Sequence, residues 1–520
     1  MAPEACEGPQ VVTVAASIPT TEKDPRDLKI TPYVVLKFAV STFLVFFCIA
    51  VIVRLILDEN TKVAYDASPA ISLVVIVLAM VWLFMVEGGQ ASLVGLAPVD
   101  RALYEESHPM THQICSLGHR GNNLDRYLIG RQFLVLLIVF TTNQCGAALK
   151  DSEVFGLPDW FLDIFLGSGI SMILVTSCCG QLMGQVNASH CMLDFIDTQF
   201  MNVTLWICLA VEASGVFHCA YLVQYGFALI SNKRLDLKED PRTWIQGFFF
   251  WGRVVMSLGI LAGCLVVTVS AMVNGQSTAW QSIPSGICVI FFFLCMYIVG
   301  MLEGMQIAFF AVSKLTQSER DFSPMSNYSC NIIYQGNNLP NFMIGRQIFV
   351  TLNFFVIARL TTMDVDFNEG DETVFGVSKP LQAFFNTGLP GAIVTTILGS
   401  VGWQLVASAY PETFLGSPFC HILLRVCLFL ENTGVCSAAW FFALIHKCLA
   451  GFQYDEHFIG TAEERKARKK AELMENARRR PASPQRKTPQ TRTLSSLNQN
   501  NTTIDVMESS SGGDDNNLGN

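Results

Sequence analysis

Two short polar motifs occur twice in this chain, each time inside or beside a long apolar run. The tetrapeptide Glu87-Gly88-Gly89-Gln90 returns as Glu303-Gly304-Met305-Gln306, and the tripeptide Gly130-Arg131-Gln132 returns as Gly345-Arg346-Gln347. Charged side chains at membrane depth are rare, and they usually face a bundle interior or a solute pathway. The two copies are therefore predicted to form one central solute site.

The side chains of these motifs combine charge with hydrogen-bonding groups. On a helix, Glu87 and Gln90 share one face, and the glycine between them allows a solute or another backbone to approach closely. Arg131 and Gln132 are adjacent, so they point about 100° apart around the helix. One can neutralise a glutamate while the other faces the solute. The alternative is that glutamate and arginine only fix helix packing, but such a buried pair stabilises poorly.

The elements that must position these motifs are transmembrane helices. Of the 520 residues, 51% are hydrophobic and 15% are charged, whereas soluble domains carry about a quarter charged residues. Ten segments have the roughly 20 apolar residues that a helical span needs, which predicts an all-α polytopic membrane protein. The predicted spans are 33–57, 71–96, 127–149, 160–182, 200–229, 245–273, 283–312, 342–360, 381–406 and 419–449.

The second five spans repeat the first five. Because five is an odd number, the second repeat is expected to lie upside down relative to the first, as a 5+5 inverted repeat. Many secondary transporters have this plan, with the site at the repeat interface. Further matches, in chain order, are Gly121-Asn122-Asn123-Leu124 with Gly336-Asn337-Asn338-Leu339, Val154-Phe155-Gly156 with Val374-Phe375-Gly376, Gln181-Leu182 with Gln404-Leu405, and Cys208-Leu209 with Cys427-Leu428.

The charge distribution predicts the orientation in the membrane. Both tails are rich in lysine and arginine, which places them in the cytoplasm. The loop with Lys233, Arg234, Lys238 and Arg242 disagrees, because ten spans would put it outside. The glycosylation sequon at Asn327 falls in a predicted outer loop. The predicted organisation is an N-terminal tail (1–32), repeat 1 (33–230), a loop (231–244), repeat 2 (245–450), a basic cytoplasmic helix (451–480) and a disordered tail (481–520).

Other side chains are candidates for binding cations. Glu212 and Glu431 occupy matching places in spans five and ten. Hard cations prefer oxygen ligands, so both glutamates are candidate sodium ligands, with simple salt-bridge partners as the alternative. His108, His112 and His119 precede span three, and a solvated loop is favoured there over a zinc site. The 17 cysteines include no CxxC pair and are expected to pack as small hydrophobes.

The paired EGxQ and GRQ motifs resemble those of the silicic acid (silicon) transporter family of diatoms and other silicifying protists. The resemblance covers about residues 33–449, and all four motifs are complete. It implies sodium-coupled uptake of orthosilicic acid through the plasma membrane, and a role at intracellular silica-depositing membranes stays open. The chain has no HExxH, GxSxG, Walker A or GxGxxG motif, so it is expected not to be an enzyme and to have no bound cofactor. The substrate-binding residues that the resemblance implies are Glu87, Gly88, Gln90, Gly130, Arg131, Gln132, Glu303, Gly304, Gln306, Gly345, Arg346 and Gln347.

The motif side chains suit such a solute. Orthosilicic acid is neutral and tetrahedral, and each of its four hydroxyls both donates and accepts. Amides of Gln90, Gln132, Gln306 and Gln347 offer both functions. Concentrating a neutral solute needs a co-transported ion, and sodium is the expected one. Membrane lipid is the other expected partner, and no nucleic acid is expected. The oligomeric state stays open. Two alternatives remain: a passive channel or uniporter for silicic or boric acid, and a membrane receptor that signals through its tail.

Overall fold

The computed structural model describes residues 31–149, 154–162, 165–166, 169–233, 239, 241–278, 283–363, 365 and 373–479. Most of the predicted N-terminal tail and all of 481–520 lie outside these residues. The described chain is helical, and it has no strands apart from two isolated bridges. One compact unit ends at Ala467, and a second begins at Arg468, within helix α23 (Ala462–Arg479). Helix α23 occupies the stretch for which a charged helix is expected.

Seven helical segments of the described residues are long and apolar enough to cross a membrane. Three of them begin at hydroxyl caps, where Thr31, Ser68 and Thr243 accept backbone N–H groups of the first turn. The seven are α1 (Pro32–Leu57), α3 (Pro69–Leu96), α5 (Asn123–Gly146), α12 (Trp244–Val273), α13 (Ser285–Val312), α15 (Asn338–Thr361) and the run Leu389–Ala409, which comprises α17 (Leu389–Val394), the π-helical η6 (Thr395–Val401) and α18 (Gly402–Ala409).

Shorter helices connect and cover these segments. The first half contains α2 (Lys62–Asp66), α4 (Pro109–Gly118), α6 (Asp159–Leu162), α7 (Ile170–Val175), the π-helical η3 (Thr176–Leu182), α8 (Met183–Ala188), α9 (Met192–Ile196), α10 (Gln199–Ala213) and α11 (Ala220–Ile230). The second half contains α14 (Pro324–Ile333), α16 (Lys379–Asn386), α19 (Pro411–Leu415), α20 (Pro418–Asn432), α21 (Ala438–Ala450) and α22 (Glu456–Ile459).

Matched backbone conformations show that the two halves share their local structure. Gly215 and Gly434 are both left-handed, with φ of 82° and 83°. Phe155 and Phe375 also share positive φ values, 52° and 55°, that non-glycine residues seldom adopt. The π-helical segments η3 and η6 occupy matching positions in the two halves. The internal repeat is therefore a repeat of structure as well as of sequence.

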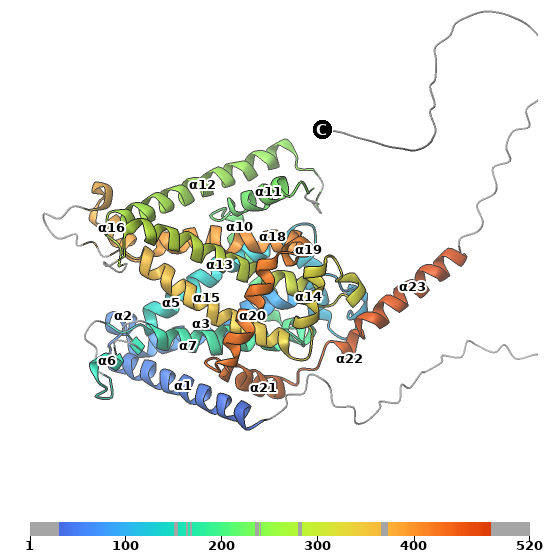
Figure 1. Ribbon diagram of the computed structural model, residues 1–520, viewed down its shortest axis with the longest axis horizontal. Helices are drawn as coiled ribbons and strands as arrows, with labels where there is room; N and C mark the ends of the chain where they lie inside the picture. Colours follow the sequence, from blue (N-terminus) through green and yellow to red (C-terminus); the bar gives the residue numbers. More distant parts are fainter. Residues whose placement is uncertain are drawn as a thin grey trace, which may run out of the picture. The chain divides into compact units, whose positions relative to one another are not determined.

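The two halves run in the same direction, so the predicted inversion is wrong. The matching helices α3 and α13 have 28 residues each, and a Cβ placed on Gly95 near the end of α3 would lie 3.5 Å from Oγ of Ser313, just after α13. Inverted repeats would put these matching ends on opposite faces. Within the compact unit, α2, α6 and α16 lie at one end and α14, α19 and α22 at the other (Figure 1). We call the end with the loops after α3, α8, α13 and α21 the tail face, and the other the opposite face.

The predicted spans five and ten are re-entrant helix pairs, so the prediction of ten crossings is also wrong. Before α10, Asp197 accepts a 2.8 Å hydrogen bond from the backbone N–H of Thr111 in α4, at the tail face. After α11 the chain enters α12, which begins at the same face. Gly215 makes the turn between them, and Gly434 makes the matching turn between α20 and α21. In the described chain, eight segments join the two faces: the seven above and the α7–η3–α8 segment.

The re-entrant pairs also link the halves. Helix α11 packs against α18 of the second half, and α21 packs against α1 and α8 of the first half. The predicted repeats 33–230 and 245–450 therefore interleave. The sequon residue Asn327 lies on α14, at the tail face, so it shares a face with the C-terminal segment and is not on the opposite side from it.

We expect the loops after α1 and before α16 to be accessible from the same side of the membrane. Tyr65 and Phe375 are exposed there, and Tyr65→Cys and Phe375→Cys should both react with a membrane-impermeant maleimide added on that side. As a control, Lys466→Cys at the tail face should react only from the other side. An inverted ten-span chain would instead label Tyr65→Cys and Phe375→Cys from opposite sides, and site-resolved mass spectrometry distinguishes the two results.

Candidate functional site

A cavity of about 510 Å³ lies between the halves of the compact unit. Its walls include Asn143 near the end of α5, and Thr362 and Gly388, which lie between α15 and α17 at the opposite face. Its floor is formed by motif residues, among them Glu87 and Glu303. Within the described chain, no residue of the tail-face loops lines it. The cavity thus runs from the opposite face to the motifs and is closed toward the tail face.

The first motif pair forms a buried ion pair at this floor. Nη2 of Arg131 on α5 lies 2.5 Å from Oε2 of Glu87 on α3, and both side chains are nearly inaccessible to solvent. Arg131 also donates from Nη1 to Oε1 of Gln132, at 2.7 Å. The Gln185 amide donates a 2.8 Å hydrogen bond to the same Glu87 oxygen. The carboxylate is therefore neutralised by the arginine of its own repeat, and Gln132 is held beside it.

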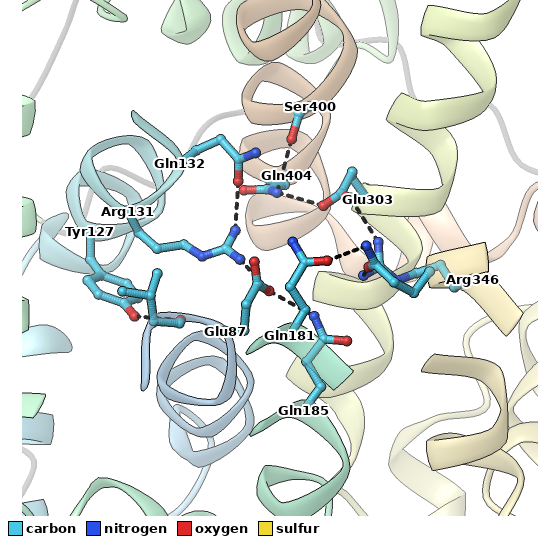
Figure 2. Close-up of polar contacts among 12 residues, drawn as sticks. Glu87, Tyr127, Arg131, Gln132, Gln181, Gln185, Glu303, Arg346, Ser400 and Gln404 are labelled. Carbon is cyan, nitrogen blue, oxygen red and sulfur yellow. Dashed lines mark hydrogen bonds and ion pairs between the residues drawn. The ribbon is translucent and has the colours of Figure 1, made fainter. Parts of the chain in front are cut away.

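The second motif pair repeats this arrangement. Arg346 lies 2.8 Å from Oε1 of Glu303 and donates to Gln347 at 3.0 Å. The Gln404 amide donates a 2.9 Å hydrogen bond to the other Glu303 oxygen. Figure 2 shows the two glutamate–arginine pairs facing each other, with glutamine side chains between them. Two carboxylates and two guanidiniums cancel, so the floor is polar and hydrogen-bonding but carries no net charge.

The glutamines next to these ion pairs show that the sequence match of Gln181 with Gln404 is wrong. The interval that relates η3 to η6 pairs Gln185 with Gln404, and both amides donate to the glutamate of their own half. Gln181, matched to Gln404 by sequence, corresponds instead to Ser400. Gln181 accepts a 2.6 Å hydrogen bond from the Gln347 amide and so joins the halves. The interval that relates Cys208 to Cys427 would have matched Gln185 to Gln404 from sequence, whereas the adjacent Gln-Leu dipeptides suggested Gln181.

The motif glycines contact protein groups. A Cβ on Gly88 would lie 2.2 Å from the Phe195 ring, and Gly304 has the same relation to Phe414, at 2.3 Å. Both rings come from the tail-face segments after α8 and α18. They fill the helix surface next to each glutamate.

The glycines of the GRQ motifs allow two helices to cross. A Cβ on Gly130 would lie 1.8 Å from the backbone oxygen of Cys208 in α10, and a Cβ on Gly345 would lie 1.7 Å from that of Cys427 in α20. No side chain fits between these backbones. The re-entrant helices are therefore seated directly on α5 and α15, one position before the arginines.

Six of the twelve predicted substrate residues line the cavity: Glu87, Arg131, Gln132, Glu303, Arg346 and Gln347. Gln90 and Gln306 do not, because they lie one helical turn nearer the tail face, with 0% and 1% of their surface exposed. Neither amide atom of Gln90, nor Nε2 of Gln306, has a hydrogen-bond partner among the described residues. Buried polar groups without partners cost about 1–3 kcal/mol each, so these two amides need a functional explanation.

The candidate sodium ligands Glu212 and Glu431 lie outside the cavity lining and differ from each other. Glu431 forms a 2.9 Å ion pair with Lys37 of α1. Glu212 instead lies 3.3 Å from Nε2 of His218 and accepts a 3.3 Å hydrogen bond from the Tyr221 hydroxyl. Of the four buried glutamates, Glu212 is the one without a lysine or arginine ion pair within the described chain.

The histidines before α5 are structural, and the solvated loop favoured for them is wrong. His108 is buried and lies 3.0 Å from Asp194, and His119 bonds to the carbonyl of Leu93 at 2.8 Å. No cluster of three or more histidine, cysteine, aspartate or glutamate side chains suited to a metal occurs among the described residues. The imidazoles of His108 and His119 instead tie the tail-face segment to α9 and α3.

This fold and site define an integral membrane protein with a buried, uncharged polar cavity, of the kind that moves small polar solutes. The comparison with protein families identifies it more closely. Residues 29–513 match the model of the silicon transporter family, and the chain belongs to that family. No curated protein and no solved structure matches the chain. The resemblance drawn from the EGxQ and GRQ motifs is thereby confirmed.

Proposed function

We propose that this protein imports orthosilicic acid across the plasma membrane, coupled to sodium, by alternating access between its two parallel halves. The observation that carries the proposal is the uncharged cavity floor, where each ion pair holds a glutamine, Gln132 or Gln347, at the cavity lining. A neutral tetrahydroxy solute needs several donors and acceptors and no net charge, and amides supply both. A charged substrate would leave this floor with an unpaired charge in a poorly solvated site.

The closed tail face supports alternating access over a permanently open channel. The buried Phe195 and Phe414 rings pack on Gly88 and Gly304, next to the floor glutamates, and they come from tail-face segments. Just beyond the floor, both amide atoms of Gln90 and Nε2 of Gln306 are buried without a hydrogen-bond partner among the described residues. Opening the tail face would expose these amides to the passing solute and satisfy them. The EGxQ motif then serves both states, with its glutamate at the floor and its glutamine on the exit side.

The orientation follows from the parallel arrangement. The loop from α11 to α12, which carries Lys233 and Arg242, now lies at the tail face, because α12 begins there. This loop therefore shares a face with Lys314, Arg465 and Lys466, and it no longer disagrees with a cytoplasmic C-terminal segment. By the positive-inside rule this side is the cytoplasm. The cavity then opens to the cell exterior, as an importer requires.

Sodium coupling is proposed to involve Glu212. Its counterpart Glu431 is already paired with Lys37, whereas Glu212 directly contacts an imidazole and a phenol and forms no ion pair with a lysine or arginine within the described chain. A buried carboxylate without a fixed cation is stabilised when a mobile cation binds. We expect Glu212→Gln to reduce the stimulation of uptake by sodium about tenfold. Glu431→Gln should leave the dependence of uptake on sodium concentration unchanged. An identical sodium curve in Glu212→Gln would return that residue to a structural role.

The direct test is uptake of labelled silicic acid, or its germanium analogue, into proteoliposomes with and without an inward sodium gradient. Accumulation above equilibrium only with the gradient is expected. Equilibration regardless of sodium would establish the channel or uniporter alternative. No flux in folded, inserted protein would contradict transport itself and leave the receptor alternative.

A further inference from the structure

The segment 452–467 after α21, here called the C-terminal strap, bonds to both halves at the tail face. Asp455 is fully buried. Its backbone N–H donates to the carbonyl of His190 at 3.1 Å, and its Oδ1 accepts from the backbone N–H of Leu193 at 2.9 Å. Its other carboxylate oxygen lies 2.8 Å from Nζ of Lys314. His190 and Leu193 follow α8 in the first half, and Lys314 follows α13 in the second.

Neighbouring strap residues strengthen the same connection. The backbone N–H of Gln453 donates to Asp194 at 2.6 Å in the first half. In the second half, Arg465 donates to the carbonyl of Lys314 at 2.7 Å, and Lys466 donates to the hydroxyl of Ser318 at 2.8 Å. The strap therefore bridges two tail-face loops that belong to different halves, on the face where the cavity is closed.

We propose that the strap is a latch that keeps the tail side of the pathway closed until its Lys314–Asp455 contact releases. This inference rests on the proposed alternating access, in which the two tail-face loops must separate. A buried ion pair suits such a device: it adds little net stability when intact, and breaking it exposes an uncompensated charge unless water enters. Release is therefore coupled to the entry of water from the tail face.

The latch belongs to one half only. The interval that relates Glu87 to Glu303 places Pro98 at the position matching Lys314. Proline has no cation to offer, so the first half lacks the equivalent contact. Burial alone would lower the pKa of Lys314, but the neighbouring Asp455 and Glu456 carboxylates raise it above its usual value. One strap thus controls a closure that two symmetric halves share.

Cys191 is a native reporter for this latch. It is buried at the N-cap of α9, next to His190, whose carbonyl accepts from the strap, and burial raises the pKa of its thiol to about 12. Maleimides react with the thiolate, so Cys191 is inert while the strap is seated. Release would both expose the thiol and return its pKa toward the ordinary value near 8.5.

The test uses full-length protein in lipid nanodiscs, with N-ethylmaleimide labelling resolved by mass spectrometry. We expect Lys314→Met to speed labelling of Cys191 at least tenfold. Cys427, buried at the contact between α20 and α15, should remain unlabelled and reports on global unfolding. Lys37→Met is the matched control, because it removes another buried lysine ion pair without touching the strap, and Cys191 should stay inert.

Each outcome decides the inference. Unchanged Cys191 labelling in folded Lys314→Met overturns it. If Cys427 reacts as well, Lys314→Met has unfolded. Asp455→Asn then replaces it, because this variant removes the charge but keeps the hydrogen bond to Leu193. Labelling of Cys191 is again compared with labelling of Cys427. These measurements need no solute, so a failure of sodium-driven uptake would refute the proposed function without altering the labelling result.

Discussion

Replacing Arg346 with methionine is expected to lower uptake at least a hundredfold and to destabilise the protein. The guanidinium neutralises Glu303 at 2.8 Å and holds Gln347 at 3.0 Å. Removing it leaves the nearly buried Glu303 carboxylate without a cation partner, which typically costs about 3–5 kcal/mol. It also frees the Gln347 amide that bridges to Gln181. Uptake into proteoliposomes and thermal unfolding in detergent measure the two effects.

A double variant separates these effects. Glu303→Gln with Arg346→Met removes both charges, so most of the lost thermal stability should return, whereas uptake should stay absent because the floor has lost its donors. Arg126→Met is the matched control: Arg126 lies on α5 of the first half, is partly exposed and pairs with Glu239, so it should keep nearly full uptake. Normal uptake by Arg346→Met would remove the ion pair from the solute site.

The clustering of the motif glutamates and arginines was largely predictable from sequence, because its evidence is local and duplicated. Glutamate and arginine inside apolar runs need partners, and two copies of each point to one place. The sequence could not decide which glutamate pairs with which arginine, since that depends on helix rotation. The structure pairs Glu87 with Arg131 and Glu303 with Arg346, each within its own half.

The topology was not predictable by counting apolar runs. The run 200–229 has the length and composition of one span, yet it contains two helices that turn back at Gly215. Hydropathy measures how apolar a segment is and carries no information on whether it returns to the face it entered. A glycine in the middle of the run and the basic loop after it were the two available signals. Together they favour a re-entrant pair over a fifth crossing.

The roles of the motif glycines also lay beyond the sequence. A glycine next to a candidate ligand is as compatible with solute contact as with helix crossing. Only the position of a second element separates the two, and here Phe195 occupies the surface of Gly88, and the Cys208 carbonyl that of Gly130. Those neighbours follow their glycines by many tens of residues, so no local pattern reveals them.

These crossings give the second large prediction: Gly130→Ala and Gly345→Ala should each prevent stable folding. The added methyl group would lie 1.8 Å or 1.7 Å from a backbone oxygen, and a backbone cannot rotate away as a side chain can. Overpacking of a core typically costs about 1–3 kcal/mol, and a backbone clash lies at or above the upper end. Yield of monodisperse protein and its unfolding temperature measure the effect.

Gly263→Ala on α12 is the matched control, because a Cβ there meets no atom within 4 Å. Alanine is favoured over glycine in a helix by about 1 kcal/mol, so this variant should fold at least as well as the unchanged chain. The two crossing variants should behave alike because their contacts are matched between halves. If Gly130→Ala folds normally but loses uptake, the glycine serves the solute and the crossing of α10 over α5 is looser than the structure indicates. If it folds and transports normally, α10 is not seated on α5, and the re-entrant arrangement itself is contradicted.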